Sequence, residues 1–74
     1  MTDSARATLD RMNDEARQLR RTAAAWIDEA NSPHRSGNIG RDCRALGWTS
    51  PDQLIRAADL KEREAHATRL ALGL

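Results

Sequence analysis

The side chains that could bind a metal or act as a nucleophile are Cys43, His34 and His66. They show none of the spacings of metal sites, such as Cys-x-x-Cys or His-x-x-x-His. A catalytic Cys–His pair would require the fold to bring two of them together, and nothing in the spacing predicts this. We therefore expect no enzymatic activity, no metal and no cofactor, with a buried small thiol at position 43 and two surface histidines.

A second candidate is the segment Gly37-Asn38-Ile39-Gly40, which has the Gly-x-x-Gly pattern of loops that clamp nucleic-acid backbones. KH modules need strands around such a loop, and no strand is predicted from this sequence. The pattern is short enough to recur by chance. We interpret it as a flexible helix entry.

A third candidate covers the second half of the chain, which is similar in outline to a helix-turn-helix motif. A short helix, a turn at Gly47 and a helix starting at Ser50-Pro51 follow one another. Arginine and glutamine side chains can read base edges and contact phosphates. The residues that could contact nucleic acid or a partner protein are Arg35, Arg41, Arg44, Trp48, Gln53 and Arg56.

The fit to a DNA-binding motif is imperfect. The buried position after the turn should fall near Gln53, whereas the apolar residue is Leu54, and Asp52 would face the phosphates. The net charge of +1 provides no strong positive field. DNA binding is therefore our alternative interpretation, and protein–protein interaction is the preferred one.

The elements that position these residues are predicted to be helices only. The 74 residues include no Phe, Tyr or Val, and Ala, Arg, Leu, Asp and Glu dominate. This composition favours an all-α fold. We expect a single domain over 1–74, with a long helix at about 3–30, a loop at 31–37, a short helix at about 38–46 and a long helix at about 51–72. The two long helices should form an antiparallel hairpin whose end is closed by the short one.

Local signals predict where the helices begin and end. Pro33 disfavours helix at the preceding residue, and Gly47 can end the short helix, with Trp48 folding back over its last turn near Cys43. The last helix has the strongest start signal, because Ser50 and Gln53 can form a capping box around Pro51.

The most regular pattern in the chain is an apolar seam along the first helix. Small or apolar residues recur at alternating steps of four and three from Ala5 to Ala30, as in helices that pack on another helix. Glu15 and Arg20 flank this seam and could pair between parallel chains. We expect self-association through Leu9, Met12, Ala16, Leu19, Ala23 and Trp26.

The seam has two interpretations. It can pack on the chain's own third helix, or it can also form a homodimer, and we favour the homodimeric helical bundle because so short a chain has a thin core. The third helix also has two apolar sides, which is typical of a helix with two neighbours. The run Lys61-Glu62-Arg63-Glu64 is interpreted as a solvated face.

These observations together predict a small regulatory or adaptor protein that acts by binding another protein. No apolar run is long enough to span a membrane, and the polar start is unlike a secretory signal. The single cysteine suits a reducing cytoplasm, where we expect the protein to act.

Overall fold

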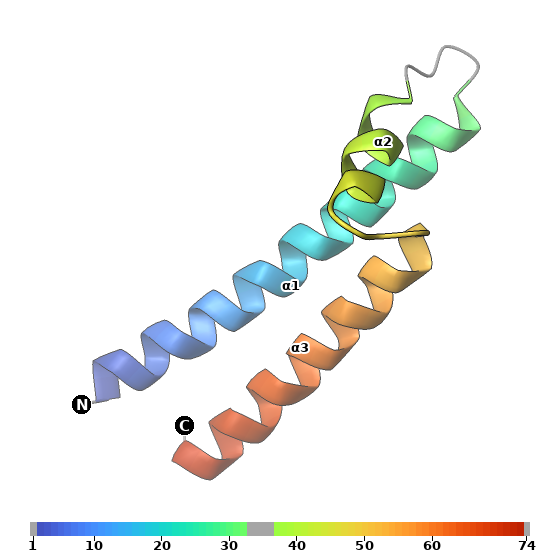
Figure 1. Cartoon of the computed structure of the whole chain (residues 1–74). Helices are drawn as coiled ribbons and strands as arrows, with labels where there is room; N and C mark the ends of the chain where they lie inside the picture. Colours follow the sequence, from blue (N-terminus) through green and yellow to red (C-terminus); the bar gives the residue numbers. More distant parts are fainter. Residues whose placement is uncertain (1, 33–36, 74) are drawn as a thin grey trace.

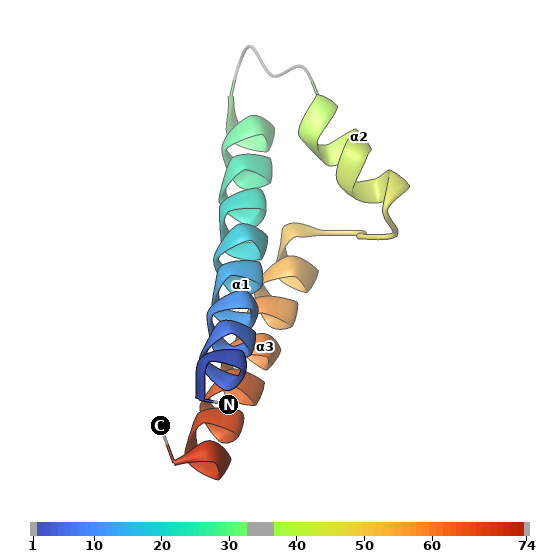
Figure 2. The same cartoon turned by 90° about the vertical axis from the view of Figure 1, so that its left-hand side faces the viewer.

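The computed structural model describes residues 2–32 and 37–73. These residues form three α-helices: α1 (Thr2–Asn31), α2 (Asn38–Ala45) and α3 (Pro51–Leu72). The long helices α1 and α3 run antiparallel, side by side, and α2 lies against the carboxyl-terminal end of α1 (Figures 1 and 2). The all-α helical hairpin expected from the composition is confirmed, and each helix end falls within one residue of its prediction.

The molecule is a rod of 49 × 19 × 18 Å with a radius of gyration of 15.2 Å. A compact domain of this length would have a radius of gyration of about 11 Å. Two helices side by side enclose little volume, and the buried side chains are accordingly few and small. Within the described residues they are Leu9, Ala16, Ala23, Trp26, Cys43, Leu54, Ala58 and Ala65.

The apolar seam of α1 faces α3 and α2 of the same chain. Ala16 is 1% exposed and Trp26 is 6% exposed. Alanines at alternate positions of the seam let the two long helices approach closely, since a methyl group occupies little space between two backbones. The core is densest where α1, α2 and the start of α3 meet, around Ala23, Trp26, Cys43 and Leu54.

A glycine determines how closely α2 approaches α1. A Cβ atom placed on Gly40 would lie 2.8 Å from Nε1 of Trp26, closer than real Cβ atoms approach such a neighbour. Glu29 fixes the same end of α2, because its Oε2 accepts a hydrogen bond of 2.9 Å from the backbone N–H of Ile39 and its Oε1 accepts one of 3.4 Å from Gly40. The amino-terminal N–H groups of α2 thus find their acceptor on another helix.

The connection between α2 and α3 follows the predicted turn chemistry. Gly47 has φ +100°, and the N–H groups of Gly47 and Trp48 donate to the carbonyl oxygens of Arg44 and Cys43, which is a Schellman motif. Trp48 then packs against the core beside Cys43, as expected.

The predicted capping box at the start of α3 forms only in part. The hydroxyl of Ser50 makes no capping hydrogen bond. The side chain of Gln53 instead accepts a hydrogen bond of 2.8 Å from the N–H of Thr49, one residue before the predicted donor. The extended backbone of Ser50 and the proline at the first helical position still start the helix where expected.

Candidate interaction surfaces

The six residues predicted for self-association all lie along the α1 seam. Leu9, Ala16, Ala23 and Trp26 are buried within the single chain, and Met12 and Leu19 are half-buried. The hairpin itself therefore provides most of the cover that the seam requires. A second copy could reach the four buried side chains only if α3 or α2 moved away, so a homodimer needs a further surface.

The charged residues beside the seam pair with α3. Nζ of Lys61 lies 2.7 Å from Oε2 of Glu15. On the other edge, Nε of Arg20 lies 2.7 Å from Oε1 of Glu62, and its Nη2 contacts Asp59 as well. In this structure, Glu15 and Arg20 thus link the two helices of one hairpin, whereas the sequence suggested pairing between chains.

These pairs shift the ionisation of their members in the expected directions. The hydrogen bond and charge of Lys61 lower the pKa of Glu15, and Glu15 raises the pKa of Lys61. The hydrogen bond from Arg20 lowers the pKa of Glu62. The interpretation of 61–64 as a wholly solvated face was therefore incomplete, because two of its four residues bind α1.

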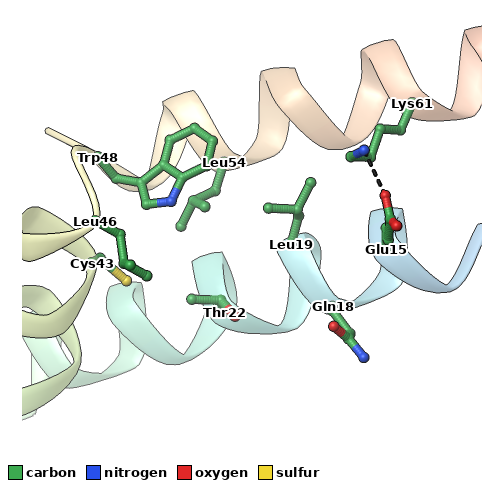
Figure 3. Close-up of a pocket in the computed structure, with 9 residues that line it drawn as sticks. All are labelled: Glu15, Gln18, Leu19, Thr22, Cys43, Leu46, Trp48, Leu54 and Lys61. Carbon is green, nitrogen blue, oxygen red and sulfur yellow. Dashed lines mark hydrogen bonds and ion pairs between the residues drawn. The ribbon is translucent and has the colours of Figure 1, made fainter. Parts of the chain in front are cut away.

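A groove of about 280 Å³ lies between the middle of α1, the α2–α3 turn and the first turns of α3 (Figure 3). Apolar atoms dominate its surface, and the Glu15–Lys61 pair crosses one end. Its other lining residues include Leu19, Thr22, Cys43, Leu46, Trp48 and Leu54.

One leucine of this groove is almost uncovered. Leu46 caps the end of α2 and is 79% exposed, although it lies beside the buried Cys43. Burial raises the pKa of the Cys43 thiol, with a further contribution from Asp42, so the thiol stays protonated at neutral pH. The sulfur therefore contributes to packing.

A second apolar surface lies on the side of α3 that faces away from α1. Leu60 is 56% exposed, and Leu70 and Ala67 are exposed as well. Charged residues such as Arg63 lie next to these apolar side chains on the helix surface. The two apolar sides predicted for this helix thus have different surroundings, since one packs on α1 and the other is open.

The residues predicted to contact nucleic acid differ in their exposure. Arg41, Arg44 and Arg56 are exposed, Trp48 is half-buried, and Gln53 is tied to the turn. Arg35 lies outside the described residues. Within the described part of the chain, the backbone of α2 approaches α1 closely and does not approach α3, although Cys43 of α2 and Leu54 of α3 belong to one core cluster. The two helices of the predicted motif therefore share core side chains without close backbone packing.

The described residues contain no group of three or more His, Cys, Asp or Glu side chains that could hold a metal ion. Nor does this part of the chain contain a helix long and apolar enough to cross a membrane.

Sequence analysis missed Glu29 and Lys61 as positioning residues. Each acts across the space between two helices, and the spacing of charges along one helix carries no signal for such a contact.

Comparison of the chain with family models, with curated proteins and with solved structures found no match.

Proposed function

We propose that this chain is a small non-enzymatic helical protein that acts as a regulator or adaptor, by binding another protein and by self-association. The observation that carries the proposal is the amount of apolar surface left open by the hairpin. Leu46, Leu60 and Leu70 are each more than half exposed, on a molecule in which half of the described buried core residues are alanines. Leu46 lies at the groove and Leu60 and Leu70 lie on the open side of α3, so both surfaces offer apolar side chains for contact with a partner.

The total accessible surface supports the same proposal. It is 5582 Å², whereas a compact monomer of 8.2 kDa would expose about 4,500 Å². The surplus of about 1,000 Å² follows from the thin rod shape of the hairpin, which leaves much of each long helix open to a partner.

Sedimentation equilibrium of the wild type and of a triple variant, Leu46→Lys, Leu60→Lys and Leu70→Lys, tests self-association. The wild type should have a mass above that of one chain at micromolar concentration, and the triple variant should be monomeric. A wild type that remains a compact monomer over the whole range contradicts self-association.

Site-specific photo-crosslinking in cells tests the adaptor role. A photoreactive residue at position 60 should give discrete crosslinked products that contain a second protein, because this side of α3 is open. The matched control is the exposed position Arg21 on α1. Equal labelling at both positions would argue against a specific partner on α3.

The alternative, a helix-turn-helix DNA reader, has weaker support. Gln53, which should read bases, already accepts a hydrogen bond from Thr49, and Asp52 stands in the first turn of α3. Retention on duplex DNA that falls steeply with added salt would favour this alternative, because phosphate contacts release counterions.

We propose that the protein acts in a reducing compartment such as the cytoplasm, since its single cysteine is buried and has no disulfide partner in the chain.

A further inference from the structure

The short helix and the last helix are attached to α1 in different ways. α2 is fixed to α1 by the hydrogen bonds that Glu29 accepts and by the close approach at Gly40. Along the chain, α3 is joined to this unit by residues 46–50, three of which are exposed. The hairpin therefore consists of an α1–α2 unit and an α3 unit with a short connection between them (Figures 1 and 2).

The fit between α1 and α3 does not depend on which chain supplies α3. Leu54 and Ala58 of α3 are 1% and 0% exposed, and among the described helices α1 is the one that packs closely on α3. The charge pairs on both edges, such as Glu15 with Lys61 at 2.7 Å, match the same register. The α3 of a second copy carries the same side chains at the same spacing, so it complements α1 equally well.

We propose that two copies of this chain exchange α3, so that α3 of each copy packs on α1 of the other while each α2 stays on its own α1. Residues 46–50 form the hinge, which straightens in the exchanged dimer. Exchange of an identical element is a low-cost route to a dimer, because the interface already exists in the closed chain. The inference goes beyond the proposed function, since the exchanged contacts lie on the covered face of α1 and not on the exposed leucines.

The hinge is long enough for this exchange. Five residues in an extended conformation span about 17 Å, at about 3.4 Å per residue. The rod measures 19 × 18 Å across. A straightened hinge therefore carries the start of α3 across nearly the width of one hairpin, to the α1 of a copy that lies beside it.

The turn between α2 and α3 is what favours the closed chain. Gly47 has φ +100°, and the N–H groups of Gly47 and Trp48 donate to the carbonyl oxygens of Arg44 and Cys43. Straightening the hinge gives up these hydrogen bonds, whereas the contacts between α1 and α3 are regained in the dimer. The balance between the two forms therefore depends on the energy of the turn and on the protein concentration.

Two alanine substitutions test the role of the hinge. Gly47→Ala strains the closed turn, because φ is +100° there, and no atom lies within 4 Å of the added Cβ. Since an exchanged dimer contains two straightened hinges, its association constant should rise at least about 30-fold. Gly73→Ala is the matched control and should leave association unchanged, because Gly73 has φ +73° and equally open surroundings at the far end of α3.

A crosslinking measurement identifies the chain that supplies α3. The chain has a single lysine, so a zero-length carbodiimide crosslink between Lys61 and Glu15 reports the pairing of α3 with α1. Equal amounts of isotopically light and heavy chains are unfolded, mixed and refolded at millimolar concentration under reducing conditions, and the dimer is isolated by gel filtration. Exchange predicts that half of the crosslinked peptide pairs combine a light and a heavy peptide.

Two results would overturn the inference. If the isolated dimer gives only light–light and heavy–heavy peptide pairs, the copies associate without exchange, and self-association through the exposed leucines stands. If neither the wild type nor Gly47→Ala gives a dimer after refolding, both the exchange and the self-association in the proposed function fail. If circular dichroism shows that Gly47→Ala does not fold, the labelling experiment on the wild type decides alone.

The triple variant Leu46→Lys, Leu60→Lys and Leu70→Lys separates the two modes of association. Refolded at millimolar concentration, it should still form the exchanged dimer with mixed peptide pairs, because the contacts between α1 and α3 are intact. A dimer held together by the exposed leucines would be lost in this variant.

Discussion

Single residues decide how the short helix attaches to the long one. Gly40 allows α2 to approach the indole of Trp26, and the carboxylate of Glu29 accepts hydrogen bonds from the first N–H groups of α2. Trp26 lies in the buried seam, so its ring has little freedom to move aside. The attachment therefore depends on the side chains of Trp26 and Glu29 in α1 and on the absence of a side chain at Gly40 in α2.

Gly40→Ala should destabilise the protein by about 1–2 kcal/mol. The overpacking against Trp26 costs about 1–3 kcal/mol, and the higher helix propensity of alanine returns up to about 1 kcal/mol. Urea unfolding measures the difference. In a Trp26→Phe background, which lacks the clashing Nε1 atom, the same substitution should cost less. An equal loss in both backgrounds would contradict a clash with the indole.

Glu29→Ala should lower the free energy of unfolding by about 1 kcal/mol, because the N–H groups of Ile39 and Gly40 lose their acceptor. Asp28→Ala is the matched control, since it removes the same charge from the neighbouring, exposed position. Urea denaturation of the two variants compares them directly. Equal stability of both would show that the Glu29 contact contributes nothing.

At the scale of the elements, the pairing of α1 with α3 combines a seam of small residues with charge pairs on both edges. The ends of the helices were predictable from local chemistry, because proline, glycine and the residues around Ser50 act within a few positions of themselves. That the seam needed a helix against it was also predictable from its spacing. The identity of the helix that covers the seam was not predictable, because periodicity does not distinguish the chain's own α3 from the α3 of a second copy.

The charge pairs between α1 and α3 could not be predicted from the sequence for a related reason. Glu15 meets Lys61 and Arg20 meets Glu62 only because α3 has one particular register against α1. The candidate groove depends on the same register, and it was not predicted, although Trp48 and Cys43 were correctly expected to be neighbours.

Arg20→Ala should lower the urea midpoint at low ionic strength, and the loss should shrink in concentrated salt, because exposed charges are screened over a few ångströms there. Arg17→Ala is the control, because Arg17 pairs with Asp14 on its own helix and both side chains are well exposed. A loss from Arg20→Ala that persists in high salt would indicate a packing role instead of an electrostatic one.

At the scale of the whole molecule, the hairpin is a thin rod whose two long helices are joined by complementary charges. The pKa values of Glu15 and Glu62 lie below the ordinary value of 4.5 in the folded state. A carboxyl group with a lowered folded-state pKa stabilises the fold above its unfolded-state pKa, and this contribution disappears as the pH falls through the folded-state value.

The free energy of unfolding should therefore stay level from neutral pH to about pH 5 and decline at lower pH, where these carboxylates become protonated. Urea unfolding at a series of pH values measures the profile. The double variant Glu15→Gln, Glu62→Gln should be less stable at neutral pH and should show a shallower decline in acid. A profile as steep as that of the wild type would show that other carboxylates dominate.

The one-sided attachment of α2 has a consequence for local opening. Because the backbone of α2 approaches α1 and not α3 within the described residues, α2 can detach while most of the contact between α1 and α3 stays closed. Native-state hydrogen exchange should then divide the backbone amides into two classes, with lower protection for α2 than for the middle of α1 and α3. In a molecule with so small a core, the short helix would be the first unit to exchange.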